Sequence, residues 1–193
     1  MVESIGQEIC IDKATKPRSS LIELFQEPET LEKIKNEKWD YVVIQERTIK
    51  ALQEDDISEF KEGSTSICNK IVENNPKTKI IYNAEGVYCD FNLEKYETTN
   101  KHYEQIAKMT NGVVTYSGNA FINFNRKFPD IELYEDKQHP TLVGAYLSAC
   151  CLYNTIFNDS SVNTQYYDVL NPKIAMDLQR IADETIMRNK KKE

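Results

Sequence analysis

The chain has 193 residues, a formal net charge of −7 and 28% charged residues. That length fits one domain with a sizeable core, so we expect a single domain over 1–193 whose basic end, 188–193, frays into solvent. The acidic balance offers no basic face, which excludes nucleic acid as an expected partner. No run of about 18 apolar residues occurs, so no membrane span is expected.

Cysteine and glycine usage argues against metals and nucleotide cofactors. The five cysteines form no C-x-x-C pair and have no histidine at ligand spacing, so we expect no metal. Glycine totals six and no G-x-G-x-x-G occurs, so no nucleotide cofactor is expected. Cys150 and Cys151 lie in an apolar stretch and are expected to be core thiols. The odd cysteine count and the absence of a visible signal peptide favour a cytoplasmic protein, although an upstream signal peptide could be missing.

Apolar segments of strand length alternate along the chain with segments of helical periodicity. The expected strands are 8–12, 40–45, 79–83 and 112–116, and their continuous apolar character is typical of buried parallel strands. The expected helices are 28–37, 55–75 (with Gly63 weakening its middle), 93–110, 119–128, a nearly all-apolar one from 140 or 141 to 157, and a last one that Asn171 caps.

This alternation predicts an α/β fold, namely a three-layer α/β/α sandwich around a mostly parallel sheet. Functional residues in such sheets follow the carboxyl ends of the strands. The stretches of interest are therefore 13–20, 45–48, 84–90, 117–119 and 136–139.

The loop at 136–140 (D-K-Q-H-P) carries the strongest chemical signal. In a tight turn, the carboxylate of Asp136 can accept a hydrogen bond from Nδ1 of His139, three residues later. That contact would fix the tautomer and leave Nε2 free to take a proton from a nucleophile. The alternative interpretation is that Asp136 only caps a turn and that His139 is an ordinary loop histidine.

Three stretches of sequence resemble the SGNH/GDSL hydrolases, which are esterases and acyl-hydrolases on a flavodoxin-like sheet. The stretch 39–46 (W-D-Y-V-V-I-Q-E) resembles the third strand of one subgroup of that family. Asp136-x-x-His139-Pro140 resembles the final block, in which Asp and His complete a catalytic triad. The helix that follows continues the likeness through Gly144, Tyr146, Leu147 and Ala149.

The resemblance implies hydrolysis of a small-molecule ester or an acylated carbohydrate without metal or cofactor. His139 would act as general base and Asp136 would orient it. The family's first block, G-[DN]-S, supplies the nucleophilic serine, and we find no counterpart to it. The likeness runs from about Glu8 to Phe157, so the domain is N-terminally incomplete relative to the family and its sheet is expected to lack the usual first strand. The remaining strands would then either close the gap or leave an edge through which two copies of the chain pair.

The positions that would bind the oxyanion differ from those of the family, and no single residue is identified as the nucleophile. Relatives place glycines after their second strand, whereas this chain has Pro17, which lacks an N–H, and a bulky Arg18. The candidate oxyanion or site-lining residues are Gln45, Glu46, Arg18 and Ser19. The alternative nucleophiles are Ser117, Ser20 and Cys89, of which Ser117 also fits an ordinary turn and Cys89 an ordinary loop.

Three hypotheses follow. The first is an SGNH-type serine hydrolase whose sequence lacks the nucleophile-bearing segment, so that this chain is expected to have lost most of the activity. The second is a degenerate relative that serves as a non-catalytic binding or interaction protein, which the Pro17–Arg18 change favours. The third is an unrelated α/β small-molecule binder. This last hypothesis requires the side chains of Asp136 and His139 to be more than about 5 Å apart, beyond any hydrogen bond.

Overall fold

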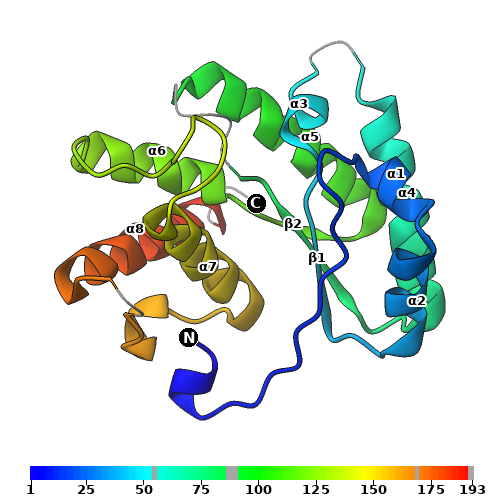
Figure 1. Cartoon of the computed structure of the whole chain (residues 1–193), viewed down its shortest axis with the longest axis horizontal. Helices are drawn as coiled ribbons and strands as arrows, with labels where there is room; N and C mark the ends of the chain where they lie inside the picture. The colour runs from blue at the N-terminus through cyan, green and yellow to red at the C-terminus, as the bar shows by residue number, and fades with distance from the viewer. Residues whose placement is uncertain (54–55, 86–90, 168–169, 191–193) are drawn as a thin grey trace. The chain divides into compact units, whose positions relative to one another are not determined.

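The structure, a computed structural model, describes residues 1–53, 56–85, 91–167 and 170–190 (Figure 1). Two compact units are built from interleaved segments of the chain. Unit 1 comprises Met1–Cys10, Ala84–Tyr96 and Thr115–Glu193, and unit 2 comprises Ile11–Asn83 and Glu97–Val114. The prediction of a single domain stays a prediction, and each unit is described by itself.

Unit 2 contains the parallel sheet. Its strands are β1 (Tyr41–Ile44), β2 (Lys79–Asn83) and β3 (Val113–Thr115), in the order β1-β2-β3, and the last residue of β3 belongs to unit 1. β1 and β2 pair in parallel, with Tyr41 opposite Lys79 and Ile44 opposite Tyr82. β1 is therefore an outer strand of the described sheet, and Val43 on it is 43% exposed. Whether this edge recruits a second copy stays a prediction.

Two helices of unit 2 have recognisable start signals. Ser20 and Glu23 form a reciprocal capping box at the start of α1 (Leu21–Phe25), and Pro28 occupies the first position of α2 (Pro28–Asn36). The other helices are α3 (Thr48–Ala51), α4 (Ser58–Asn74) and α5 (Leu93–Thr110), of which α5 begins in unit 1. Phe60 of α4 and Tyr103 of α5 meet edge to face at 4.9 Å and help to form the core of this unit.

Unit 1 is built around three helices, α6 (Ser117–Lys127), α7 (Leu142–Phe157) and α8 (Pro172–Lys190), with short 3-10 helices at Glu3–Ile5 and Ser161–Thr164. Phe121 of α6 and Leu147 of α7 are completely buried in the shared core, and burial of each contributes roughly 1.5–3 kcal/mol. Even α7, the most apolar of the described helices, does not meet the length and hydropathy of a membrane span, and none of the others does. Cys150 and Cys151 are buried core thiols, as predicted.

The α/β alternation predicted from the sequence is confirmed, and the observed sheet is consistent with the expected three-layer class. The strand expected at 8–12 is wrong. That segment is irregular and exposed, with Ile9 41% and Ile11 77% exposed, because no described strand pairs with it and an isolated strand is not stable. Of the basic end expected to fray, residues 188–190 belong to α8, which continues to Lys190, and 191–193 lie outside the described residues.

Gly63 has a packing role that its helical position does not suggest. A Cβ atom placed there would lie 2.5 Å from the backbone nitrogen of Ile22 and 2.9 Å from the carbonyl carbon of Leu21. Only a glycine therefore lets α1 cross α4 at this distance. The sequence interpretation of Gly63 as a weak point in a helix misses this contact, because the partner lies about forty residues earlier in the chain.

We predict that Gly63→Ala destabilises the fold by about 1–3 kcal/mol, because overpacking against the α1 backbone outweighs the gain in helix propensity of up to about 1 kcal/mol. Urea denaturation measures the change. Glu62→Ala, at an exposed position of the same helix, is the control and should have little effect. A Gly63→Ala variant more stable than the parent would contradict the packing argument.

Candidate functional site

Asp136 and His139 lie together in unit 1 in the arrangement that their spacing predicts. The carboxylate oxygens of Asp136 are 2.8 and 3.0 Å from His139 Nδ1. The same carboxylate accepts the backbone N–H of His139 at 2.9 Å and that of Gln138 at 3.2 Å. The side-chain contact contradicts the requirement of the unrelated-binder hypothesis for a separation above about 5 Å.

The loop that carries this pair is closed like a small hairpin. Tyr134 and Pro140 form an antiparallel bridge, and the N–H of Glu135 donates to the carbonyl of His139 at 2.8 Å. Lys137 completes the turn in the left-handed region, with φ of 75°. A non-glycine residue in that conformation is uncommon, so the backbone holds the turn at some energetic cost.

The start of α7 anchors the same loop. Thr141 caps the helix, since its Oγ1 accepts the N–H of Gly144, and that hydroxyl donates to the carbonyl of Glu132 at 2.9 Å. A Cβ at Gly144 would lie 2.4 Å from the carbonyl oxygen of Leu133, so this position tolerates only glycine. The glycine of the G-x-Y-L block therefore has a specific structural role, because it lets the helix approach the loop.

The histidine is open to solvent on its outer side. The side chain of His139 is 74% exposed. Hydrogen bonds from His139, its backbone N–H first, lower the pKa of Asp136 to about 2, so the carboxylate is ionised at neutral pH. Within 1–53, 56–85, 91–167 and 170–190, no hydroxyl donates to Nε2 of His139. Nε2 is therefore open to a group from outside.

The alternative nucleophiles do not complete a triad in the structure as described. Ser117 opens α6 with 0% exposure and contacts the thiol of Cys151, and Ser20 is 2% exposed in unit 2. Ser19 is half-buried in the turn that precedes α1. Cys89 lies outside the described residues. Burial keeps Ser117 and Ser20 from meeting a substrate without local rearrangement.

The residues expected to bind an oxyanion or line the site, Ser19 among them, belong to unit 2, and so does Ser20. Gln45 is exposed just after β1, and its Oε1 accepts a hydrogen bond from the side chain of Asn83 at 2.8 Å. Arg18 is exposed in a left-handed turn with φ of 64°. These observations do not identify an oxyanion hole, so the roles of Gln45 and Arg18 stay predictions.

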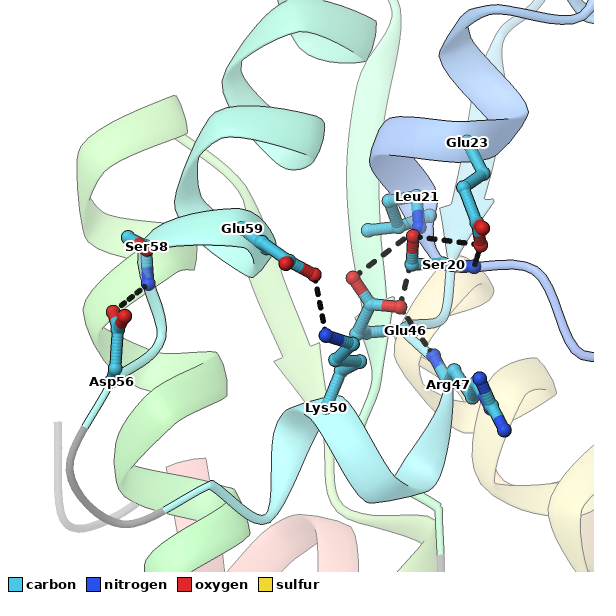
Figure 2. Close-up of polar contacts among 9 residues, drawn as sticks. All are labelled: Ser20, Leu21, Glu23, Glu46, Arg47, Lys50, Asp56, Ser58 and Glu59. Atoms are coloured by element: carbon cyan, nitrogen blue, oxygen red, sulfur yellow. Dashed lines mark hydrogen bonds and ion pairs between the residues drawn. The ribbon is translucent and has the colours of Figure 1, made fainter.

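Glu46 has a structural role rather than the expected position on an open site wall. It is 2% exposed and accepts the N–H of Leu21 at the start of α1 and the N–H of Arg47 at 2.6 Å (Figure 2). Its own N–H donates to the hydroxyl of Tyr103 at 3.0 Å. Burial raises the pKa of the Glu46 carboxyl, an effect that the two N–H donors and nearby Lys50 oppose. The residue thus ties α1 and α5 to the end of β1.

A cavity beside Asp136 was not predicted from the sequence. It has a volume of about 450 Å³ and includes Phe91, Ile131, Tyr134 and Glu135 among its lining residues. These positions share no motif and are spread over more than forty residues, so no local pattern could reveal the cavity. No group of three His, Cys, Asp or Glu side chains with metal-binding geometry occurs in the described part of the chain.

Comparison with known proteins gives one structural relative. No protein-family model matches the chain, and no curated protein matches it. The fold is similar to the crystal structure of a DUF4886 family protein from Bacteroides uniformis, with a TM-score of 0.71 and 19% sequence identity. The match covers 81% of this chain but only 66% of that protein. At this identity the likeness establishes a common α/β fold and carries no activity with it.

We predict that the Asp136 carboxyl titrates near pH 2 and that His139→Ala moves its midpoint towards the ordinary value of 3.8. A depressed folded-state pKa stabilises the protein above the unfolded value, and this stabilisation is lost as the pH falls from about 4 to about 2. Carbon-detected NMR of the side-chain carboxyl measures the midpoint. His102→Ala, which removes the other histidine, should leave it unchanged, and an unshifted midpoint in His139→Ala would contradict the contact.

We predict that Glu46→Ala destabilises unit 2 by about 1–3 kcal/mol, because it leaves the buried N–H of Leu21 and the partly buried N–H of Arg47 without their acceptor. Glu46→Gln keeps an acceptor and should cost much less. Since the folded state holds the Glu46 proton more tightly, the stability linked to that proton falls as the pH rises through the raised pKa, and Glu46→Gln should lack this dependence.

Denaturation curves between pH 4 and 8 test both parts of this prediction. Glu73→Ala, which removes an exposed carboxylate of α4 paired with Lys70, is the matched control and should change stability little. Equal losses of stability in Glu46→Ala and Glu73→Ala would contradict the prediction that the hydrogen bonds of Glu46 stabilise unit 2.

Proposed function

We propose that the chain is an SGNH-type ester hydrolase in which His139 is the general base and Asp136 orients it. One observation carries the proposal, the 2.8 Å contact between Asp136 and Nδ1 of His139 on an exposed loop. The motif likeness at 39–46 and 136–149 and the shared α/β fold support it. Nδ1 donates to the carboxylate, so Nε2 presents a lone pair outward.

In the proposed reaction, Nε2 of His139 takes the proton of a nucleophilic hydroxyl as its oxygen bonds to the ester carbonyl carbon. The imidazolium then returns that proton to the leaving alkoxide as the carbon–oxygen bond breaks. Water, activated by the same nitrogen, releases the acid. Asp136, ionised at neutral pH, stabilises the imidazolium in each step. In SGNH hydrolases the hydroxyl belongs to a serine, and the buried Ser20 and Ser117 do not fit that role.

A non-catalytic binding or interaction protein with the same fold is the second candidate. It is favoured by the open Nε2 of His139, which no described hydroxyl contacts, and by the exposed Pro17–Arg18 turn, where relatives have glycines. In this case the Asp136–His139 pair would be a remnant that shapes the loop.

The test compares hydrolysis of p-nitrophenyl acetate by the parent chain, His139→Ala, Asp136→Asn and His102→Ala. We expect His139→Ala to lose about 10²–10⁴-fold in kcat/KM, the usual contribution of general acid–base catalysis. Asp136→Asn should also lose activity, because the amide cannot stabilise the imidazolium. His102, whose Nδ1 contacts the carbonyl of Ala51 in unit 2, is the matched control and should retain the parent rate.

Covalent labelling identifies the nucleophile in the same samples. A serine that a fluorophosphonate probe modifies in the parent chain and not in His139→Ala would be the nucleophile, and for Ser20 or Ser117 this would require a rearrangement that exposes the buried hydroxyl. Mass spectrometry of the digest locates the labelled residue. Hydrolysis that is equal in the parent and His139→Ala, with no labelled serine, would reject the hydrolase and favour the binding protein.

A further inference from the structure

The cavity beside Asp136, called here the Phe91 cavity, lies wholly within unit 1. Its volume of about 450 Å³ falls in the usual range for small-molecule sites, about 300–1,000 Å³. The cavity is lined by other residues than His139, so a molecule inside it does not need to touch the proposed general base. The cavity can therefore bind a ligand of its own, and such binding does not require ester hydrolysis.

Two aromatic rings form one part of the cavity wall. Tyr134 is only 7% exposed, and its ring packs 5.3 Å from that of Phe121 in the core. Phe91 is half-buried, and its ring lies 5.9 Å from that of Tyr134. In the part of the chain that the structure describes, Lys79 and Lys127 lie over other rings, and no cation lies over Phe91. The negative face of the Phe91 ring is thus available to a cation from outside.

Carboxylates form most of the polar wall. Glu132, Glu135 and Asp136 line the cavity together with one cation, Lys137. Among the described residues, neither glutamate forms an ion pair, and the ammonium of Lys137 pairs with none of the three carboxylates. Three carboxylates against one ammonium give the cavity a negative potential, which attracts a cation and repels an anion.

The mixed character of the wall favours an organic cation over a bare metal ion. Metal ions such as Mg²⁺ and Ca²⁺ require six or more oxygen ligands around them, and the side chains of Phe91 and Ile131 supply none. An alkylated ammonium ion instead presents methyl or methylene groups to aromatic faces and its charge to carboxylates. A neutral apolar molecule would strip water from the carboxylates without compensating their charge.

We propose that the Phe91 cavity is a binding site for a small organic ammonium ion. The alkyl groups of the ion pack against the rings of Phe91 and Tyr134, and its positive charge lies near the carboxylates of Glu132 and Glu135. Both parts of the wall are needed for this recognition, because the rings alone accept any apolar group and the carboxylates alone accept any cation.

The test compares binding of choline and of its uncharged isostere 3,3-dimethylbutan-1-ol to the whole chain, by ligand-observed NMR and calorimetry. The two probes have nearly the same shape, so a difference in their affinity reports the charge. We expect saturable binding of choline that is about tenfold or more tighter than that of the alcohol. Choline binding should also weaken severalfold when the salt concentration rises from about 0.01 M to about 1 M, because salt screens the attraction to the carboxylates.

Two variants locate the site. Phe91→Leu keeps an apolar side chain but removes the ring, and it should weaken choline binding about threefold to tenfold while changing binding of the alcohol little. Glu135→Gln keeps the shape but removes one charge, and it should weaken choline binding by a similar factor. Glu135 is exposed, so this variant keeps the fold even if Phe91→Leu does not. Glu32→Gln, which changes an exposed glutamate of α2, is the control and should bind choline like the parent.

Three results would overturn the ammonium site. The first is the absence of saturable choline binding, and the second is equal affinity for choline and the uncharged alcohol. The third is choline binding that is unchanged in both Phe91→Leu and Glu135→Gln, or weakened equally in Glu32→Gln, since the attraction would then come from the acidic chain as a whole. Hydrolysis of p-nitrophenyl acetate, present or absent, alters none of these outcomes, so the site and the proposed activity fail or stand separately.

Discussion

The candidate site depends on one carboxylate that accepts three N–H groups at once. Asp136 receives the backbone N–H of Gln138 and both the backbone and Nδ1–H of His139. The backbone bonds close the turn, and the side-chain bond sets the tautomer and direction of the imidazole. Loop shape and histidine orientation are therefore fixed by the same charge. Everything that holds Asp136 in place, including the approach of α7 at Gly144, acts indirectly on His139.

Glu46 shows how a different environment turns the same chemical group into a structural one. Both carboxylates accept backbone N–H groups, Glu46 at the start of α1 and Asp136 within its own turn. Asp136 is exposed, and hydrogen bonds from the backbone N–H and the side chain of His139 are the largest causes that lower its pKa to about 2. Glu46 is buried, and the cost of removing its charge from water raises its pKa despite similar donors. Exposure makes the first available to chemistry, whereas burial restricts the second to holding α1, β1 and α5 together.

What the sequence predicts well is what local interactions determine. The bounds of β2 and α5 agree with the predicted 79–83 and 93–110, because periodicity is a property of the segment itself. The contact between Asp136 and His139 spans three residues and is predicted for the same reason. Two predictions fail because they depend on distant partners: the segment at 8–12 has apolar residues but no neighbouring strand, and the role of Gly63 is explained by its contact with α1. α1 itself is not predicted, because five residues are too few to show a helical period.

The geometry of the 136–139 loop is hard to explain by stability alone. An exposed pair such as Asp136–His139 adds little to folding, since water and salt screen it. Meanwhile Lys137 sits in a left-handed conformation that costs a non-glycine residue roughly 1–2 kcal/mol. A strained turn that positions an exposed histidine, and whose Asp136 and Lys137 line a cavity, is better explained by a function at that surface. Lys137 and Tyr134 belong to the same bridged loop and line the same cavity, so the strained backbone and the cavity lie on one side of unit 1.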